Sequence, residues 1–133
     1  MGYNKKELID YRLERSFQTA EEARSALELG HLFSAENRIY YACFYAVTAL
    51  ALSNDFVTSK HKQLIGWFNH NYIRTGLIPI KYGQTLKNAF SKRQESDYDD
   101  YVSFELEEVE SDFNDMIEFI NYIKNSINNQ IIT

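Results

Sequence analysis

Apolar side chains recur every three to four residues along most of this chain, which is the spacing of one face of an α-helix. The pattern predicts five helices separated by short polar segments. Their expected ranges are 4–29, 34–53, 60–74, 82–92 and 103–128. No stretch alternates apolar and polar residues between turn signals, as a half-buried β-strand would. We therefore predict an all-α protein, an up-and-down bundle of about five helices.

Glycine, proline and small polar residues mark the predicted helix ends. Gly30 and Gly76 are expected to stop the first and third helices, since glycine readily adopts the left-handed conformation that follows many helices. Ser34 is a candidate N-cap for the second helix. Pro79 lies in the connector before the fourth helix, and residues 93–101 are expected to form a hinge before the fifth. Connections this short favour antiparallel neighbours.

The segment 34–53 is expected at the centre of the bundle, because apolar and aromatic side chains surround most of its circumference. Its small residues Ala42, Ala46 and Ala49 allow another helix to approach closely. Cys43 belongs to the same apolar pattern, so we expect a buried side chain rather than a nucleophile. A single cysteine also excludes an internal disulfide.

Composition narrows the class of protein. The chain has 133 residues, 44% hydrophobic and 25% charged, which is typical of one domain over residues 1–133. No apolar run approaches the roughly 18 residues of a membrane span, and a lone cysteine fits a reducing cytoplasm. The net charge of −5 argues against a general nucleic-acid binder, which is usually basic. Ten Tyr and nine Phe exceed the needs of one small core, which predicts a homodimer.

Charge is distributed unevenly along the chain. Residues 56–94 contain seven Lys or Arg and no acid, whereas residues 95–122 contain eleven acids and no Lys or Arg. Arg93 and Asp97 lie at this junction. On a helix they would form an ion pair worth only about 0.3–0.5 kcal/mol, and in a groove Arg93 could instead hold a phosphate with two hydrogen bonds. The nearby acids lack the glycine and distal glutamate of a calcium loop, so neither a metal nor a cofactor is expected.

Lys60, His61 and Arg38 are further candidates for binding. Lys60 and His61 stand at the expected start of the third helix, where positive charge is unfavourable for the helix dipole. This suggests a nearby anion, either Asp97 or a ligand phosphate, and a solvated surface histidine is the alternative. Arg38 is costly to bury unpaired, so it either reaches solvent or pairs with an acid. The candidate acids are Glu14, Glu36 and Asp97.

Three stretches of the sequence together resemble a known family. They are Ala-Glu-Asn-Arg-Ile-Tyr-Tyr-Ala-Cys-Phe-Tyr-Ala at 35–46, Lys60-His61, and Phe-Ser-Lys-Arg at 90–93 with Asp97-Tyr98. They are similar to the HEPN superfamily (higher eukaryotes and prokaryotes nucleotide-binding domain) over most of the chain. The resemblance implies an α-helical bundle that commonly forms homodimers. Many members are metal-independent RNases that act as toxins.

The motif of those RNases is an Arg followed a few residues later by a His. In the mechanism that the resemblance implies, the His assists attack by a ribose 2′-OH and the Arg stabilises the charge on phosphorus. Arg93 matches the Arg of the motif. No His follows Arg93 in this sequence, so Tyr98 or His61 would have to act in its place.

Three functions are compatible with these residues. The favoured hypothesis is a nucleotide- or RNA-associated regulatory or binding module that forms a homodimer. Its binding residues would be Arg38, Lys60, His61 and Asp97. The resemblance further implies a toxin–antitoxin pair with a nucleotidyltransferase, which would modify Tyr98 or Tyr101. The alternatives are a divergent endoribonuclease with Arg93 and Tyr98 as catalytic residues, and a structural scaffold without a ligand.

Overall fold

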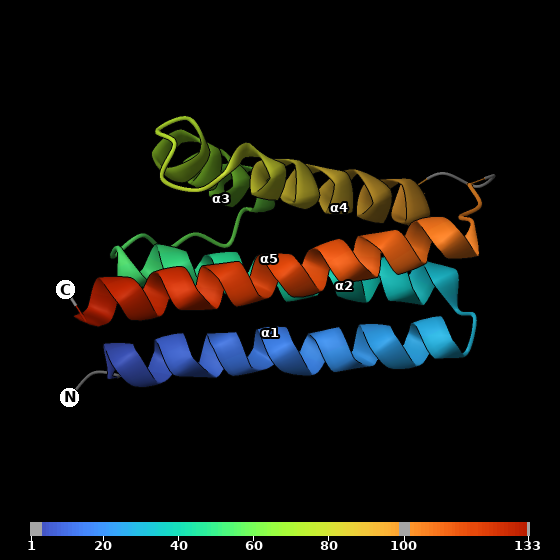
Figure 1. Cartoon of the computed structure of the whole chain (residues 1–133), viewed down its shortest axis with the longest axis horizontal. Coiled ribbons are helices and arrows are strands. Elements are labelled where there is room, and N and C mark those ends of the chain that lie inside the picture. The colour runs from blue at the N-terminus through green and yellow to red at the C-terminus, as the bar shows by residue number, and fades with distance from the viewer. Residues whose placement is uncertain (1–3, 99–101, 133) are drawn as a thin grey trace.

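The computed structural model describes residues 4–98 and 102–132, which form helices joined by short connections (Figure 1). The helices are α1 Lys5–Glu28, α2 Leu32–Ser53, α3 His61–Phe68, α4 Ile80–Tyr98 and α5 Leu106–Ile132. A π-helical turn, η1 Asn69–Ile73, directly follows α3. The described residues contain no β-strand. The predicted all-α class and its five helices are confirmed.

The four long helices run up and down along a common direction (Figure 1). Helix α2 contacts α1, α3, α4 and α5, which confirms its predicted central position. The short helix α3 and the turn η1 lie at one end of the bundle, beside the start of α4 (Figure 1). No helix in the described part of the chain has both the length and the hydropathy that a bilayer crossing requires.

Local interactions explain several helix ends. Asn4 Oδ1 accepts a hydrogen bond from the Glu7 N–H (3.2 Å) at the start of α1. Gly30 follows α1 and Gly76 follows η1, with φ angles of 74° and 80° that favour glycine. Pro79 directly precedes α4, where its fixed φ is compatible with a helix start. These three residues therefore act where the sequence predicts.

Three predicted boundaries are wrong. Helix α2 begins at Leu32, so Ser34 lies within its first turn and does not cap it. Helix α4 continues through most of the predicted hinge, because Arg93 and Asp97 pair along its surface. The remaining hinge residues, 99–101, lie outside the described residues. The third predicted helix is divided, since its last turn widens into the π-helical η1.

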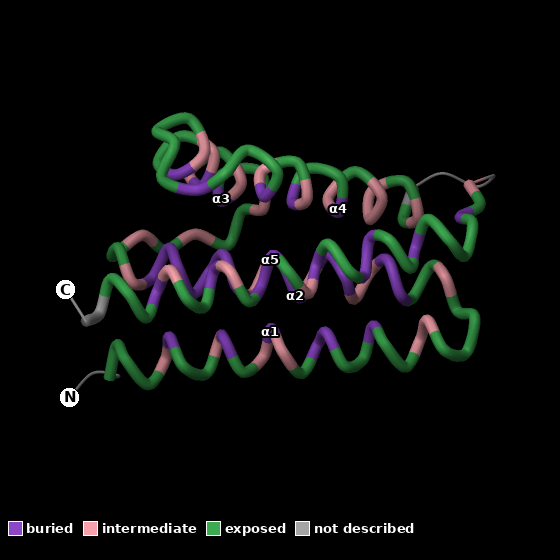
Figure 2. The backbone as a smooth tube through the Cα atoms, in the orientation of Figure 1, coloured by how far each residue is buried: buried purple, intermediate pink, exposed green. Residues whose placement is uncertain are grey.

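Small residues bring α1 and α2 close together. Ala42, Ala46 and Ala49 are fully buried, and Ser16 Oγ of α1 donates to the Ala42 carbonyl (2.7 Å). Burial recurs at helical intervals along α1, whose outer face is exposed (Figure 2). Cys43 is fully buried, as predicted, and burial raises the pKa of its thiol. Reactivity at this thiol is therefore disfavoured.

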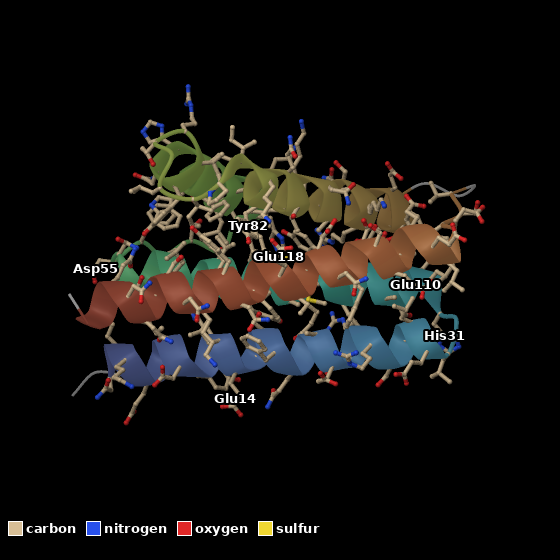
Figure 3. All side chains as sticks on the ribbon, in the orientation of Figure 1. Glu14, His31, Asp55, Tyr82, Glu110 and Glu118 are labelled. Atoms are coloured by element: carbon tan, nitrogen blue, oxygen red, sulfur yellow. The ribbon has the colours of Figure 1, made fainter. Side chains whose placement is uncertain are left out.

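The uneven charge along the sequence serves the packing of α4 on α5. Basic residues of α4 face acidic residues of α5 along the shared interface. Lys81 pairs with Glu118, and Tyr82 Oη donates to the same carboxylate at 2.7 Å (Figure 3). Further along, Lys92 Nζ lies 2.5 Å from Asp112 Oδ2. Part of the charge contrast is thus neutralised between α4 and α5, by Lys81 with Glu118 at the surface and by Lys92 with Asp112 in a largely buried position.

A buried carboxyl group completes the connection of α4 to α2. Glu36 of α2 is 1% exposed, and its Oε2 lies 3.6 Å from Lys92 Nζ. Burial, and then the neighbouring Asp112 carboxyl, raises the pKa of Glu36 to about 9. Glu36 therefore carries a proton at neutral pH. The contacts of Lys92 with Glu36 and Asp112 fix α4, and with it the adjacent Arg93, against the central helix.

Candidate functional site

Arg93 packs against two aromatic rings of α2. Its guanidinium carbon is 5.6 Å from the ring centroid of Tyr40 and 5.5 Å from that of Tyr41. Its Nε lies 3.1 Å from Asp97 Oδ2, so the predicted helical ion pair forms. The side chain of Arg93 is 20% exposed. The terminal guanidinium nitrogens have no hydrogen bond to the described residues, which leaves several N–H donors for a ligand.

His61, the first residue of α3, contacts the same two tyrosines. Its Nδ1 is 2.6 Å from Tyr40 Oη, and its ring meets the Tyr41 ring edge-on with centroids 5.9 Å apart. The imidazole also stacks on Phe44 at a centroid distance of 4.2 Å. Asp97, one of the two anions suggested for this position from the sequence, forms its ion pair with Arg93. A tyrosine hydroxyl is the polar neighbour of His61 instead.

The protonation states of Tyr40 and His61 follow from their surroundings. Burial, and then the positive charge of Arg93, lowers the pKa of His61 below its usual 6.5. Burial raises the pKa of Tyr40, so its hydroxyl keeps its proton. In the tautomer that satisfies this buried proton, Tyr40 Oη–H donates to Nδ1 and the imidazole proton is on Nε2. His61 then offers an N–H donor, as Arg93 does.

Arg38 contacts the Tyr41 ring as well. Its guanidinium carbon lies 5.3 Å from the Tyr41 centroid, and its Nε and Nη2 donate to Asn37 Oδ1 at 3.0 and 2.8 Å. Its ion pair is with Glu22 Oε1 (3.1 Å), which corrects the three acids proposed from the sequence. Arg38, Tyr40, Tyr41, His61 and Arg93 are called the Arg93 cluster below.

A hollow of about 360 Å³ adjoins the Arg93 cluster. Arg38 and Asp97 line it from opposite helices, α2 and α4, together with Asn37 and Phe33. The predicted tie between Arg38 and Asp97 is therefore replaced by an open space that both side chains face. A guanidinium and a carboxylate across such a space can each contact one bound polar group.

Two other predicted site residues lie at the margins of the cluster. Lys60 occupies the N-cap position of α3, and its backbone N–H donates to Thr58 Oγ1 (3.2 Å). The Lys60 side chain is exposed and forms no ion pair with the described residues, so its charge is available beside His61. Tyr98 ends α4, and its side chain lies outside the described residues.

The described residues contain no group of three or more His, Cys, Asp or Glu side chains arranged to hold a metal ion. Asp99 and Asp100, which were considered as ligands from the sequence, fall outside the described residues.

Sequence reasoning missed the tyrosines of the Arg93 cluster. Tyr40 and Tyr41 were interpreted as apolar surface of the central helix, and Tyr40 is indeed fully buried. Their second role, as the surface on which Arg93 and His61 meet, depends on how α3 and α4 pack on α2. The available signal was their position inside the stretch 35–46 that carries the family resemblance.

The protein is thus an all-α up-and-down bundle with a cluster of cationic and aromatic side chains beside its central helix. The chain belongs to the HEPN domain family, whose model matches residues 9–126. This range includes every residue of the Arg93 cluster.

Relatives with curated names support the same assignment. A UPF0332 protein of Thermotoga maritima is 36% identical over 105 residues, which cover 79% of this chain and 80% of that protein. A protein of Methanocaldococcus jannaschii named "Putative toxin" is 31% identical over 104 residues, covering 74% and 69%. A second protein with that name from the same organism is 29% identical over 125 residues, covering 90% and 91%.

Proposed function

We propose that this HEPN protein binds the phosphate of a nucleotide or an RNA at the Arg93 cluster. The observation that carries the proposal is the convergence of Arg93 and His61, from two different helices, on Tyr40 and Tyr41. Both side chains present N–H donors, and a guanidinium is well suited to hold phosphate oxygens in pairs.

The hydrogen bond between Tyr40 and His61 favours binding over proton removal. With Tyr40 donating to Nδ1, the free nitrogen of His61 carries a proton and stabilises negative charge. Action as a base at Nε2 requires the other tautomer, in which the buried Tyr40 hydroxyl proton loses its acceptor. Leaving a buried donor unsatisfied costs about 1–3 kcal/mol.

An endoribonuclease is the second candidate function, and the position of His61 favours it specifically. Although no His follows Arg93 in the sequence, the fold brings His61 to the same pair of tyrosines. His61 in its other tautomer would assist attack by a ribose 2′-OH, while Arg93 stabilises the charge that develops on phosphorus. The names of the two M. jannaschii relatives agree with a toxin of this kind.

One experiment separates the two candidates. A fluorescent single-stranded RNA is titrated with wild type, Arg93→Ala and Arg74→Ala, and the same samples are examined for cleavage with EDTA present. Arg74 is a matched control, since it is exposed and lies outside the Arg93 cluster. We expect Arg93→Ala to weaken binding about tenfold or more, because it removes charge-assisted hydrogen bonds. It should also reduce the salt dependence of binding by roughly one phosphate contact.

The outcomes differ clearly. Binding without cleavage supports the binding module, and cleavage that Arg93→Ala alone abolishes supports the endoribonuclease. Equal RNA affinity of wild type and Arg93→Ala, with no cleavage by either, would exclude both and leave the scaffold interpretation.

The partners are part of the same proposal. We infer a homodimer and a toxin–antitoxin pair with a nucleotidyltransferase, acting in the cytoplasm. Support for association comes from apolar side chains at the surface, among them Phe33, which is 47% exposed beside the Arg93 cluster. Tyr98 and Tyr101 remain the tyrosines that a nucleotidyltransferase would modify.

A further inference from the structure

A second cavity shares His61 with the Arg93 cluster and is not lined by Tyr40 or Tyr41. It has a volume of about 420 Å³, within the range typical of small-molecule sites, and is lined by α1, α2 and the segment leading into α3. His61 and Phe44, whose rings stack on each other, both line it. Because His61 also belongs to the Arg93 cluster, the cavity and the cluster are contiguous.

The lining of this cavity is basic, although the protein as a whole is acidic. Arg12 and Arg15 line it from α1, and no Asp or Glu is among its lining residues. The acids Asp10 and Glu14 of the same helix line a different hollow, together with Lys124. Helix α1 therefore places Arg12 and Arg15 at the cavity beside His61 and these two acids at a different hollow.

The two arginines have different surroundings. Arg15 is held in place, since its Nη2 donates to Tyr45 Oη (3.0 Å) and its guanidinium lies over the Tyr45 ring at 4.9 Å. Arg12 is half-buried and forms no ion pair with the described residues. Neither guanidinium is neutralised by a carboxylate in the described part of the chain, so both can attract an anion.

A free aromatic ring completes the cavity. Tyr11 is 55% exposed and makes no ring contact with the aromatic side chains of the described residues. Exposed rings of this kind serve as platforms on which nucleic-acid bases stack. Cationic groups beside an unoccupied aromatic face are the combination that single-stranded nucleic acids require.

We propose that this cavity receives one nucleotide of a single-stranded RNA whose neighbouring phosphate lies at the Arg93 cluster. The base stacks on Tyr11, and Arg12 and Arg15 contact the phosphate of the same nucleotide. The inference rests on the proposed function and adds the ligand class and the direction of the strand's path, across His61 toward α1. A free mononucleotide shares this chemistry, so the test includes one.

The test compares a short fluorescent single-stranded RNA with an abasic ribose-phosphate strand of the same length. Wild type, Tyr11→Ala, Tyr11→Phe, Arg12→Ala and Arg74→Ala are titrated with each strand, and uridine monophosphate serves as competitor. We expect Tyr11→Ala to weaken binding of the RNA by roughly fivefold or more and to leave the abasic strand unaffected. Tyr11→Phe, which keeps the ring, should retain the affinity of wild type. Arg12→Ala should weaken both strands, and Arg74→Ala neither.

Failure of this inference is distinguishable from failure of the proposed function. If Arg93→Ala weakens RNA binding while Tyr11→Ala and Arg12→Ala do not, the cavity is not on the path of the strand and the function stands. If wild type binds neither strand, both are overturned. If uridine monophosphate competes at the same concentration as the RNA itself, the cavity binds a free nucleotide equally well, and its assignment to an RNA strand is overturned. Tyr11 is exposed and Arg12 is half-buried, and neither belongs to the buried core, so their variants should fold, and melting curves confirm this for each.

Discussion

At the residue scale, the candidate site depends on Tyr40, which contacts both Arg93 and His61. Its ring is fully buried and packs against the Arg93 guanidinium, and its hydroxyl meets His61. A buried hydroxyl needs a hydrogen-bond partner, and His61 is the partner that the described residues provide. The arrangement holds the imidazole in one orientation and selects the tautomer that places a donor at Nε2.

The titration of His61 should report this arrangement. In wild type its pKa should be below the usual value of about 6.5, because burial and Arg93 both disfavour the charged ring. Tyr40→Phe removes the donor to Nδ1, and Arg93→Ala removes a positive charge, so each should raise the pKa. Measurement of the His61 ring signals by NMR across pH 4–8 tests this. A pKa unchanged in Arg93→Ala contradicts the proximity of the two side chains.

At the element scale, the position of α4 is set by the ionic contacts of Lys92. This lysine lies 2.6 Å from Glu108 Oε2 and also contacts Asp112 and Glu36. Lys92 and Asp112 are both largely buried, so breaking their pair is destabilising, although Lys92 would keep Glu108 as a partner. These contacts hold α4 against α2 and α5, with Arg93 beside the tyrosines.

The protonated Glu36 predicts a pH dependence of stability. Its pKa is about 9 in the folded protein against an ordinary value of 4.5, so the folded state holds a proton that the unfolded chain releases above pH 4.5. Stability should therefore decrease as pH rises from 4.5 through 9. Glu36→Gln keeps the shape and removes the titration. Its melting temperature relative to wild type should increase between pH 5 and pH 9, and a constant difference contradicts a raised pKa.

At the scale of the whole molecule, some of the cationic residues pair with acids, and others remain without an ion pair to the described residues. Lys81 pairs with Glu118 of α5 at the surface, and Lys92 pairs with the largely buried Asp112 of the same helix. Lys60, beside His61, and Arg12, at the neighbouring cavity, have no ion pair with the described residues. Part of the basic surface therefore adjoins the candidate site. This explains how an acidic protein can present a site for an anion.

A homodimer is the expected assembly. Sedimentation of wild type should give about twice the chain mass of 15.6 kDa. Phe33→Asp places a charge on the apolar surface beside the Arg93 cluster and should produce monomers, since burying an unpaired charge is costly. Leu77→Asp, at a 67% exposed position of a different connection, is the matched control and should leave the dimer intact. A wild-type monomer at all concentrations contradicts the homodimer, and a dimeric Phe33→Asp places its interface elsewhere.

Helical periodicity alone determined the class of fold, the number of helices and the central place of α2, because burial of an apolar face follows directly from spacing. The sequence also predicts the roles of Gly30, Gly76 and Pro79, because each acts through its own backbone. The predicted hinge was wrong because the continuity of α4 depends on the pairing of Arg93 with Asp97 and on the contacts of Lys92. Local sequence does not specify the latter.

The candidate site was only partly visible in the sequence. Arg93, Arg38 and His61 could be selected as polar residues in unusual positions, and the stretch 35–46 carried the family resemblance. Their convergence on Tyr40 and Tyr41, the pairing of Arg38 with Glu22, and the cavity of Tyr11 and Arg12 were decided by the packing of helices distant in the chain. Spacing along one helix predicts which residues share a face, but contacts between helices depend on crossing geometry, which the tertiary structure alone supplies.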